Sequence, residues 1–138
     1  MRRLEAVRLV QWYHFQDELL PIGASQAHRI DGPGDSDWMR LQAEVGRLYR
    51  FSTTNLGAGV DTRLSVYGPN GVQRLAFNDD ADNTTLGSAV WWAPIAPGAY
   101  FLVADDWNPG TGGCGKTYSV DAADMGQAYS VLWPLVRR

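Results

Sequence analysis

Apolar and polar side chains alternate along most of this chain with a period of two. The alternation is clear in residues 38–43, 48–53, 64–66 and 99–104. A period of two is typical of a β-strand that buries one face. The intervening turn Gly68-Pro69-Asn70-Gly71 has proline at its second position and Asn-Gly after it, which predicts a hairpin. Strands are expected about every 10–14 residues, and this spacing predicts an all-β sandwich.

Two segments fit this pattern less well. Residues 4–15 are apolar and aromatic, and are compatible with an extra strand or a short helix. Residues 121–127 are compatible with one helical turn before the β-rich composition returns at residues 128–133. The two ends of the chain are therefore treated as extensions, which either lengthen the sheets or pair with the edge of a neighbouring molecule.

Composition narrows the class of protein. A chain of 138 residues is long enough for one domain with a core of its own. The net charge of −3 offers no basic face for a phosphate backbone, so nucleic acid is excluded as the expected partner. No segment reaches the roughly 18–20 apolar residues that span a bilayer. Cys114 is the only cysteine, so no internal disulfide is expected, and Glu5 and Arg8 interrupt any signal-peptide pattern near the start.

Aspartates gather where one predicted strand ends and the next begins. Asp35 and Asp37 straddle one turn, and Asp17 with Glu18 approach it from the N-terminal arm. A second group follows the predicted hairpin and consists of Asn78, Asp79, Asp80 and Asp82. Calcium prefers several oxygen ligands, so both groups are candidate Ca²⁺ sites. The alternative is that these side chains cap the turns by bonding to backbone amides.

These motifs, in their order and spacing, resemble the bacterial pre-peptidase C-terminal domain, a relative of the collagen-binding domains of clostridial collagenases. The matching segments are 26–30, 34–38, 46–54, 61–71, 78–80, 96–100, 112–113 and 117–120. The resemblance implies a domain over residues 17–122, with extensions at 1–16 and 123–138, the second of which is expected to add a strand. It implies a jelly-roll-like antiparallel β-sandwich that is non-catalytic and exported. In the collagen-binding relatives calcium is held by the N-terminal arm and by the loop that matches Asp35 and Asp37.

One motif points to a different class of protein. Residues 110–117 fit G-x-x-x-x-G-K-[ST], the phosphate-binding P-loop. That mechanism needs a loop that leaves a buried parallel strand and opens a helix. Here residues 105–109 separate the motif from the preceding strand, and residues 117–120 are themselves predicted to be a strand. Nucleotide binding therefore ranks as the third interpretation.

Aromatic side chains supply the candidate ligand contacts. Trp91 and Trp92 are adjacent on a predicted strand, so one faces the core and the other faces outward. We take Tyr67, Trp92 and Trp107 as candidate contacts, because Trp and Tyr stack on sugar rings and anchor protein interfaces. The alternative is ordinary packing within the sandwich. No histidine pair has metal spacing and no nucleophile motif is present, so no enzymatic activity is expected.

The sequence thus favours a non-catalytic, extracellular or cell-surface binding module that recognises a protein or polysaccharide surface, with Ca²⁺ as a stabilising ion. The rival is a structural subunit that binds copies of itself through its terminal strands.

Overall fold

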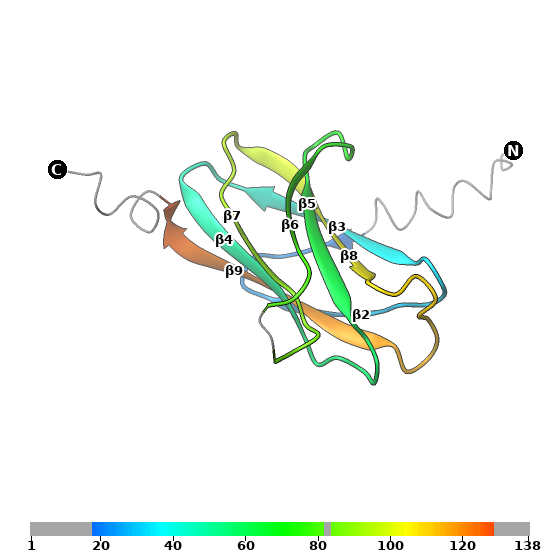
Figure 1. The fold of residues 1–138 in the computed structure, drawn as a ribbon. Coiled ribbons are helices and arrows are strands. Elements are labelled where there is room, and N and C mark those ends of the chain that lie inside the picture. Colours follow the sequence, from blue (N-terminus) through cyan, green and yellow to red (C-terminus); the bar gives the residue numbers. More distant parts are fainter. Residues whose placement is uncertain (1–17, 82–83, 129–138) are drawn as a thin grey trace, which may run out of the picture.

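Two β-sheets packed face to face make up the computed structural model, which describes residues 18–81 and 84–128 (Figure 1). The first five strands are β1 (Glu18–Leu19), β2 (Ser25–Arg29), β3 (Ser36–Ala43), β4 (Arg47–Thr54) and β5 (Thr62–Tyr67). They are followed by β6 (Arg74–Asn78), β7 (Ala89–Trp92), β8 (Gly98–Asp106) and β9 (Thr117–Gln127). The predicted all-β sandwich is confirmed. Predictions for residues 1–17, including the possible strand or helix at 4–15, lie outside the described residues, as do those for 129–138.

The chain changes sheet at almost every connection. One sheet has the order β1-β3-β8-β5-β6 and the other the order β2-β9-β4-β7. Of the connections between these nine strands, the β5–β6 hairpin alone stays within one sheet. Neighbouring strands are antiparallel except for β1, which runs parallel to β3. Repeated crossing between two antiparallel sheets is the jelly-roll-like arrangement that the sequence resemblance implied.

The core lies between the sheets and is built from the alternating positions seen in the sequence. In β3, Met39 and Leu41 are fully buried, whereas Arg40 between them is exposed. Strand β9 repeats this pattern in the opposite sheet with Tyr118 and Val120. Burying one face of each sheet removes apolar area from water at about 25 cal/mol per Å², which is the main stabilising term for such a fold.

The helical turn considered for residues 121–127 does not exist, because β9 continues through Gln127. Strand β9 lies between β2 and β4, with Asp121 in register with both Ser25 and Ser52. A strand with neighbours on both sides satisfies its backbone groups in the sheet, so local propensity for a turn is overridden. Residues 123–127, assigned above to the C-terminal extension, are thus the continuation of a central strand.

Four connecting segments meet at one end of the sandwich. The registers Ser36↔Asp105 and Thr62↔Asp106 place the start of β3, the end of β8 and the start of β5 at the same height. The loops before β3, before β5, after β6 and after β8 therefore adjoin one another, and their described residues include Asp31, Asp35, Asp61, Asp79 and Asp80. None of the described residues belongs to a helix long and apolar enough to cross a membrane.

Candidate metal centre

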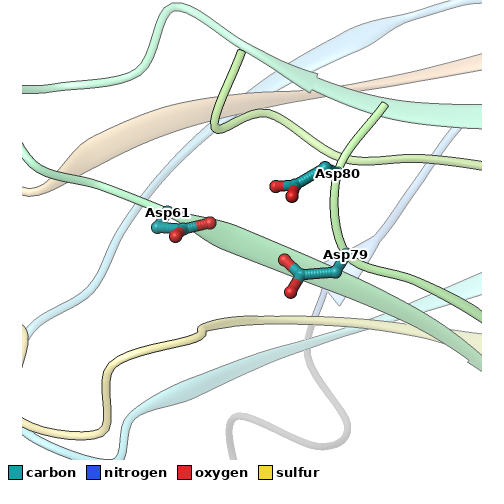
Figure 2. A group of neighbouring side chains, drawn as sticks. All are labelled: Asp61, Asp79 and Asp80. Carbon is teal, nitrogen blue, oxygen red and sulfur yellow. The ribbon is translucent and has the colours of Figure 1, made fainter. Parts of the chain in front are cut away.

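Three carboxylates converge at this end of the sandwich. Asp61 immediately precedes β5, and Asp79 and Asp80 immediately follow β6. Oxygen atoms from the three side chains lie within 4.8 Å of one another. Figure 2 shows the three side chains directed toward the space between the start of β5 and the loop after β6.

The hairpin explains why residues so far apart in sequence meet. The turn at Gly68–Gly71 closes through a hydrogen bond from Gly71 N to Gly68 O (2.9 Å). In the resulting register Leu64 lies opposite Asn78, so the residue before β5 reaches the residues after β6. The carboxylates are therefore positioned by rigid antiparallel pairing.

Two oxygen atoms of the cluster have no partner. Oδ1 of Asp61 and Oδ1 of Asp79 are shielded from solvent and accept no hydrogen bond. A buried polar atom without a partner is uncommon and costs free energy, so each such atom needs an explanation. A cation between the two side chains would satisfy both atoms.

The pKa values of two aspartates in the cluster are raised, as expected where carboxylates lie together without enough positive charge. Burial, followed by the charges of Asp79, Asp80 and Asp106, raises the pKa of Asp61 above its ordinary value of 3.8. Burial and the charge of Asp80 likewise raise the pKa of Asp79. Arg63 acts in the opposite direction on both groups, but its guanidinium is paired with Asp105 at 2.7 Å. Repulsion among the carboxylates is therefore only partly offset within the protein.

The buried carboxylate of Asp106 lies beside the cluster and holds the loops together. Both of its oxygen atoms already accept hydrogen bonds from the backbone. Asp106 is 5% exposed; its Oδ2 accepts a hydrogen bond from Asp61 N (3.0 Å) and its Oδ1 accepts one from Asn108 N (2.8 Å). Trp107 N in turn donates to Asp61 O (2.7 Å). The sequence analysis did not single out Asp106. Its position at the end of a predicted strand, next to Asp105, was the available signal.

Below the cluster, a chain of buried hydroxyl groups connects strands of both sheets. Thr62 Oγ1 lies 2.6 Å from Thr53 Oγ1 and 2.9 Å from Ser88 Oγ. Ser88 N donates to Thr53 Oγ1 (2.8 Å). Because Thr62 follows Asp61 directly, this network fixes the start of β5 and with it the position of the Asp61 carboxylate.

The donor set suits a hard divalent cation. Three carboxylates supply up to six oxygen atoms, and Ca²⁺ takes 6–8 oxygen ligands at about 2.3–2.6 Å, with water or carbonyl groups completing the shell. Sulfur and imidazole ligands, which zinc and copper prefer, are not part of this group. The residues present therefore fit calcium.

The predicted calcium ligands are only partly gathered here. Asp79 and Asp80 belong to the cluster, and Asp61, which the sequence analysis did not name as a ligand, completes it. Asn78 stays outside it, since its Nδ2 donates to Ala89 O (2.7 Å) and its Oδ1 accepts from Asp79 N (2.8 Å). Asp82 lies outside the described residues.

The other predicted group is not brought together as a cluster in the described part of the chain. Asp35 Oδ2 accepts a hydrogen bond from Asp31 N (2.9 Å), which is turn chemistry. Asp37 accepts a hydrogen bond from the hydroxyl of buried Tyr118. Glu18 lies on β1, in register with Met39 of β3, so the N-terminal arm does run beside this region. Asp17 lies outside the described residues, and calcium at Asp17, Glu18, Asp35 and Asp37 stays a prediction.

The aromatic candidates separate into three environments. Trp92 was the wrong choice as a ligand contact: it is 8% exposed and its ring lies 4.7 Å from that of Tyr100 in the core. Trp91 is the outward-facing residue of the pair, at 51% exposed. Tyr67 is half-buried against Trp38 on the outer side of the five-stranded sheet. Trp107, 58% exposed, lies beside the carboxylate cluster, since its N–H donates to Asp61 O.

The Gly-rich motif at 110–117 serves loop packing. Thr117 begins strand β9, where a P-loop would begin a helix, so the phosphate-binding context is absent. A Cβ at Gly112 would lie 2.5 Å from Cα of Gly32, so only glycine allows these two loops to touch. Lys116 Nζ donates to Ala58 O (2.7 Å), which binds the loop to a second neighbour.

Comparison with known proteins places the fold. No family profile and no curated protein matches the chain by sequence. The structure is similar to the pre-peptidase C-terminal domain of a collagenase from Bacillus anthracis (TM-score 0.58, 13% identity, 76% of this chain and 92% of that one). It is also similar to CorA, a surface-associated copper-binding protein of Methylomicrobium album BG8 (TM-score 0.59, 12% identity, 78% and 96%).

A third similar structure is Aeromonas hydrophila PliG, a periplasmic inhibitor of g-type lysozyme (TM-score 0.56, 14% identity, 78% and 95%). At these identities the similarity concerns the fold. The resemblance to pre-peptidase C-terminal domains drawn from the sequence is confirmed at that level.

Proposed function

We propose that this chain is a non-catalytic, extracytoplasmic binding module in which Ca²⁺ at Asp61, Asp79 and Asp80 holds together the loops that face a ligand. The observation that carries the proposal is the carboxylate cluster with two buried oxygen atoms that lack partners. An aqueous compartment with millimolar calcium suits such a site, because extracellular calcium modules bind with dissociation constants of about 10⁻⁴–10⁻³ M.

Similar structures support the class of protein. Their names describe a domain of a collagenase, a surface-associated copper-binding protein and a periplasmic lysozyme inhibitor. A fold is a scaffold whose function depends on its sites, so this support concerns class and compartment and leaves the ligand open.

The ligand-facing surface that we propose is the loop end that carries the metal centre. Trp107 is the exposed aromatic side chain there, and its backbone donates to the carbonyl of Asp61. Calcium at Asp61 would therefore fix the loop that presents Trp107. An exposed, pre-positioned Trp contributes large contact area at a small entropic cost, whether the ligand is a protein or a polysaccharide surface.

The first experiment is a thermal melt in excess EGTA and then in millimolar CaCl₂ or MgCl₂. Calcium at about 10–100 times the dissociation constant should add about 1.4–2.7 kcal/mol to the free energy of unfolding. We expect a rise of several degrees in Tm with calcium and a smaller one with magnesium. Equal melting curves in EGTA and calcium would remove the metal from the proposal.

Binding is tested separately with three probes in calcium: insoluble chitin, a collagen-like triple-helical peptide and a g-type lysozyme. We expect the wild-type chain to bind at least one probe, and the W107A variant to lose that binding while its Tm stays within about a degree. The matched control is W91A, which removes an exposed Trp from the outer face of the other sheet. Binding that survives W107A but not W91A would move the ligand surface to that sheet.

A further inference from the structure

The β5–β6 hairpin exposes three large apolar side chains close together. Val72 is 76% exposed, Leu75 is 40% exposed and Phe77 is 44% exposed. Leu75 and Phe77 lie on β6, and Val72 lies in the turn that precedes it. Single exposed apolar residues are ordinary, but a contiguous group on one element marks a surface that contacts something.

The group lies on an edge of the fold. Strand β6 is the last strand of the five-stranded sheet, with β5 as its neighbour on one side. An edge strand presents unpaired backbone N–H and C=O groups, and proteins usually protect it with charges, bulges or a covering loop. Here four of the five side chains of β6 are exposed, and Ala76 at its centre is half-buried.

The sequence of β6 is self-complementary around its central residue. In an antiparallel pair of two β6 strands centred on Ala76, Leu75 of one copy lies opposite Phe77 of the other, and the reverse contact repeats by symmetry. Both residues lie on the same side of the strand, because side chains two apart share a face. Directly opposed apolar and aromatic side chains stabilise antiparallel pairs.

The charged residues on and next to β6 favour the same pairing centred on Ala76. Arg74 of one copy then lies opposite Asn78 of the other, next to its Asp79 and Asp80. The guanidinium of Arg74 stacks over the Phe77 ring at 4.4 Å in the monomer, and Arg74 forms no ion pair with the described residues. An unpaired arginine thus meets an acidic loop, and like charges do not face each other.

We propose that β6 is a self-association edge: two copies pair antiparallel through β6 about a two-fold axis at Ala76, which joins their five-stranded sheets into one continuous sheet. A two-fold interface is closed, so the expected product is a dimer. The short edge predicts a weak, concentration-dependent dimer. This inference rests on the apolar pairing of Leu75 with Phe77, so it holds whether or not Ca²⁺ occupies Asp79 and Asp80.

The test is sedimentation velocity of the full chain from micromolar to millimolar concentration. We expect a shift from monomer to dimer with rising concentration. The L75K/F77K variant should raise the dimer dissociation constant at least about tenfold, because it places four lysines along the joint. Its monomer Tm should stay close to the wild-type value, since both side chains are exposed. The matched control is I95K, because Ile95 is 98% exposed and lies outside β6, in the connection between β7 and β8.

Register is tested with an L75C/F77C pair in a C114S background under mild oxidation. The proposed pairing predicts a disulfide-linked dimer, because each cysteine faces its counterpart in the second copy. The proposal is overturned if the wild-type chain stays monomeric at every concentration. It is also overturned if L75K/F77K dimerises like I95K, or if the cysteine pair forms no intermolecular disulfide in a sample that is dimeric.

Discussion

Asp61 and Asp79 flank the open end of one β-hairpin, and their side chains point toward the same space. Each also has a buried carboxylate oxygen without a hydrogen-bond partner. The hairpin is held by its ladder and by the hydroxyl chain beneath it, so the two carboxylates cannot easily separate to relieve their repulsion. A cation would convert this repulsion into a link between the ends of β5 and β6.

The Asp79→Asn variant separates metal binding from folding. Removing one negative charge from a repulsive cluster should raise the Tm in EGTA or leave it unchanged. It should also abolish most of the calcium-induced rise, because one ligand is lost. Differential scanning fluorimetry of the wild type and D79N, each in EGTA and in calcium, gives all four values. The interpretation fails if D79N keeps the full calcium shift.

The pH dependence of stability follows from the raised pKa values of Asp61 and Asp79. The folded protein holds these protons more tightly than the unfolded chain does. The stability that they contribute is therefore fully present below the ordinary value of 3.8 and is lost as the pH rises through the folded values. In EGTA, the difference in Tm between D79N and the wild type should widen as the pH rises through this window.

Asp124 contributes to the pH dependence in the opposite sense, and the comparison with D79N removes its contribution. Arg47 lowers the pKa of Asp124, so that ion pair loses stability as the pH falls. A control variant, D124N, should accordingly differ most from the wild type at neutral pH. Parallel curves for the wild type and D79N at all pH values would mean that Asp79 titrates normally.

Trp107 should report calcium binding through its fluorescence. Its backbone donates to Asp61 O, so a metal at Asp61 changes the surroundings of the indole. We expect a saturable change in tryptophan emission on titration with calcium, and its loss in W107F. The W91F variant is the control, since Trp91 is equally exposed but lies on the other sheet. A calcium signal that persists in W107F would place the ion elsewhere.

Thr62→Val tests the hydroxyl chain below the site. The substitution keeps the shape but removes one hydrogen bond from each of Thr53 Oγ1 and Ser88 Oγ, which keep their bonds to Ser88 N and to Thr62 O. Losing two buried hydrogen bonds should cost about 1–3 kcal/mol. T54V removes a hydroxyl that bonds to Asp121 on the surface and should cost less than about 0.5 kcal/mol. Urea denaturation in EGTA measures both, and similar values for the two variants would show that the chain contributes little.

Periodicity was enough to place β3, β4, β5 and β8, because every second residue along each of them belongs to the core. It was not enough for residues 121–127, where sheet neighbours from distant segments decide the conformation. The sequence alone could not decide which of Trp91 and Trp92 faces the core, because both are compatible with either face of the strand. The pairing with β4 decides it, since Trp92 lies opposite the core residue Tyr49.

Only some residues of the candidate site could be predicted from the sequence. Asp79 and Asp80, in the acidic run after β6, were recognised. Asp61, the third member of the cluster, could have been found by following the strand pairing from the turn at Gly68–Gly71 to the open end of the hairpin. Asp106 depends on a different relationship, the pairing of β5 with β8, which brings together residues 45 positions apart. Contacts of that range are set by topology, which local patterns do not encode.

The order of strands also determines when this domain can fold. The strand at the middle of the five-stranded sheet, β8, and a central strand of the other sheet, β9, are the last two strands of the described chain. During synthesis, β3 and β5 must wait for β8 to join them, and β2 and β4 must wait for β9. A chain interrupted before Thr117 would expose apolar faces without their partners, so proteolysis or aggregation of such fragments is the expected fate.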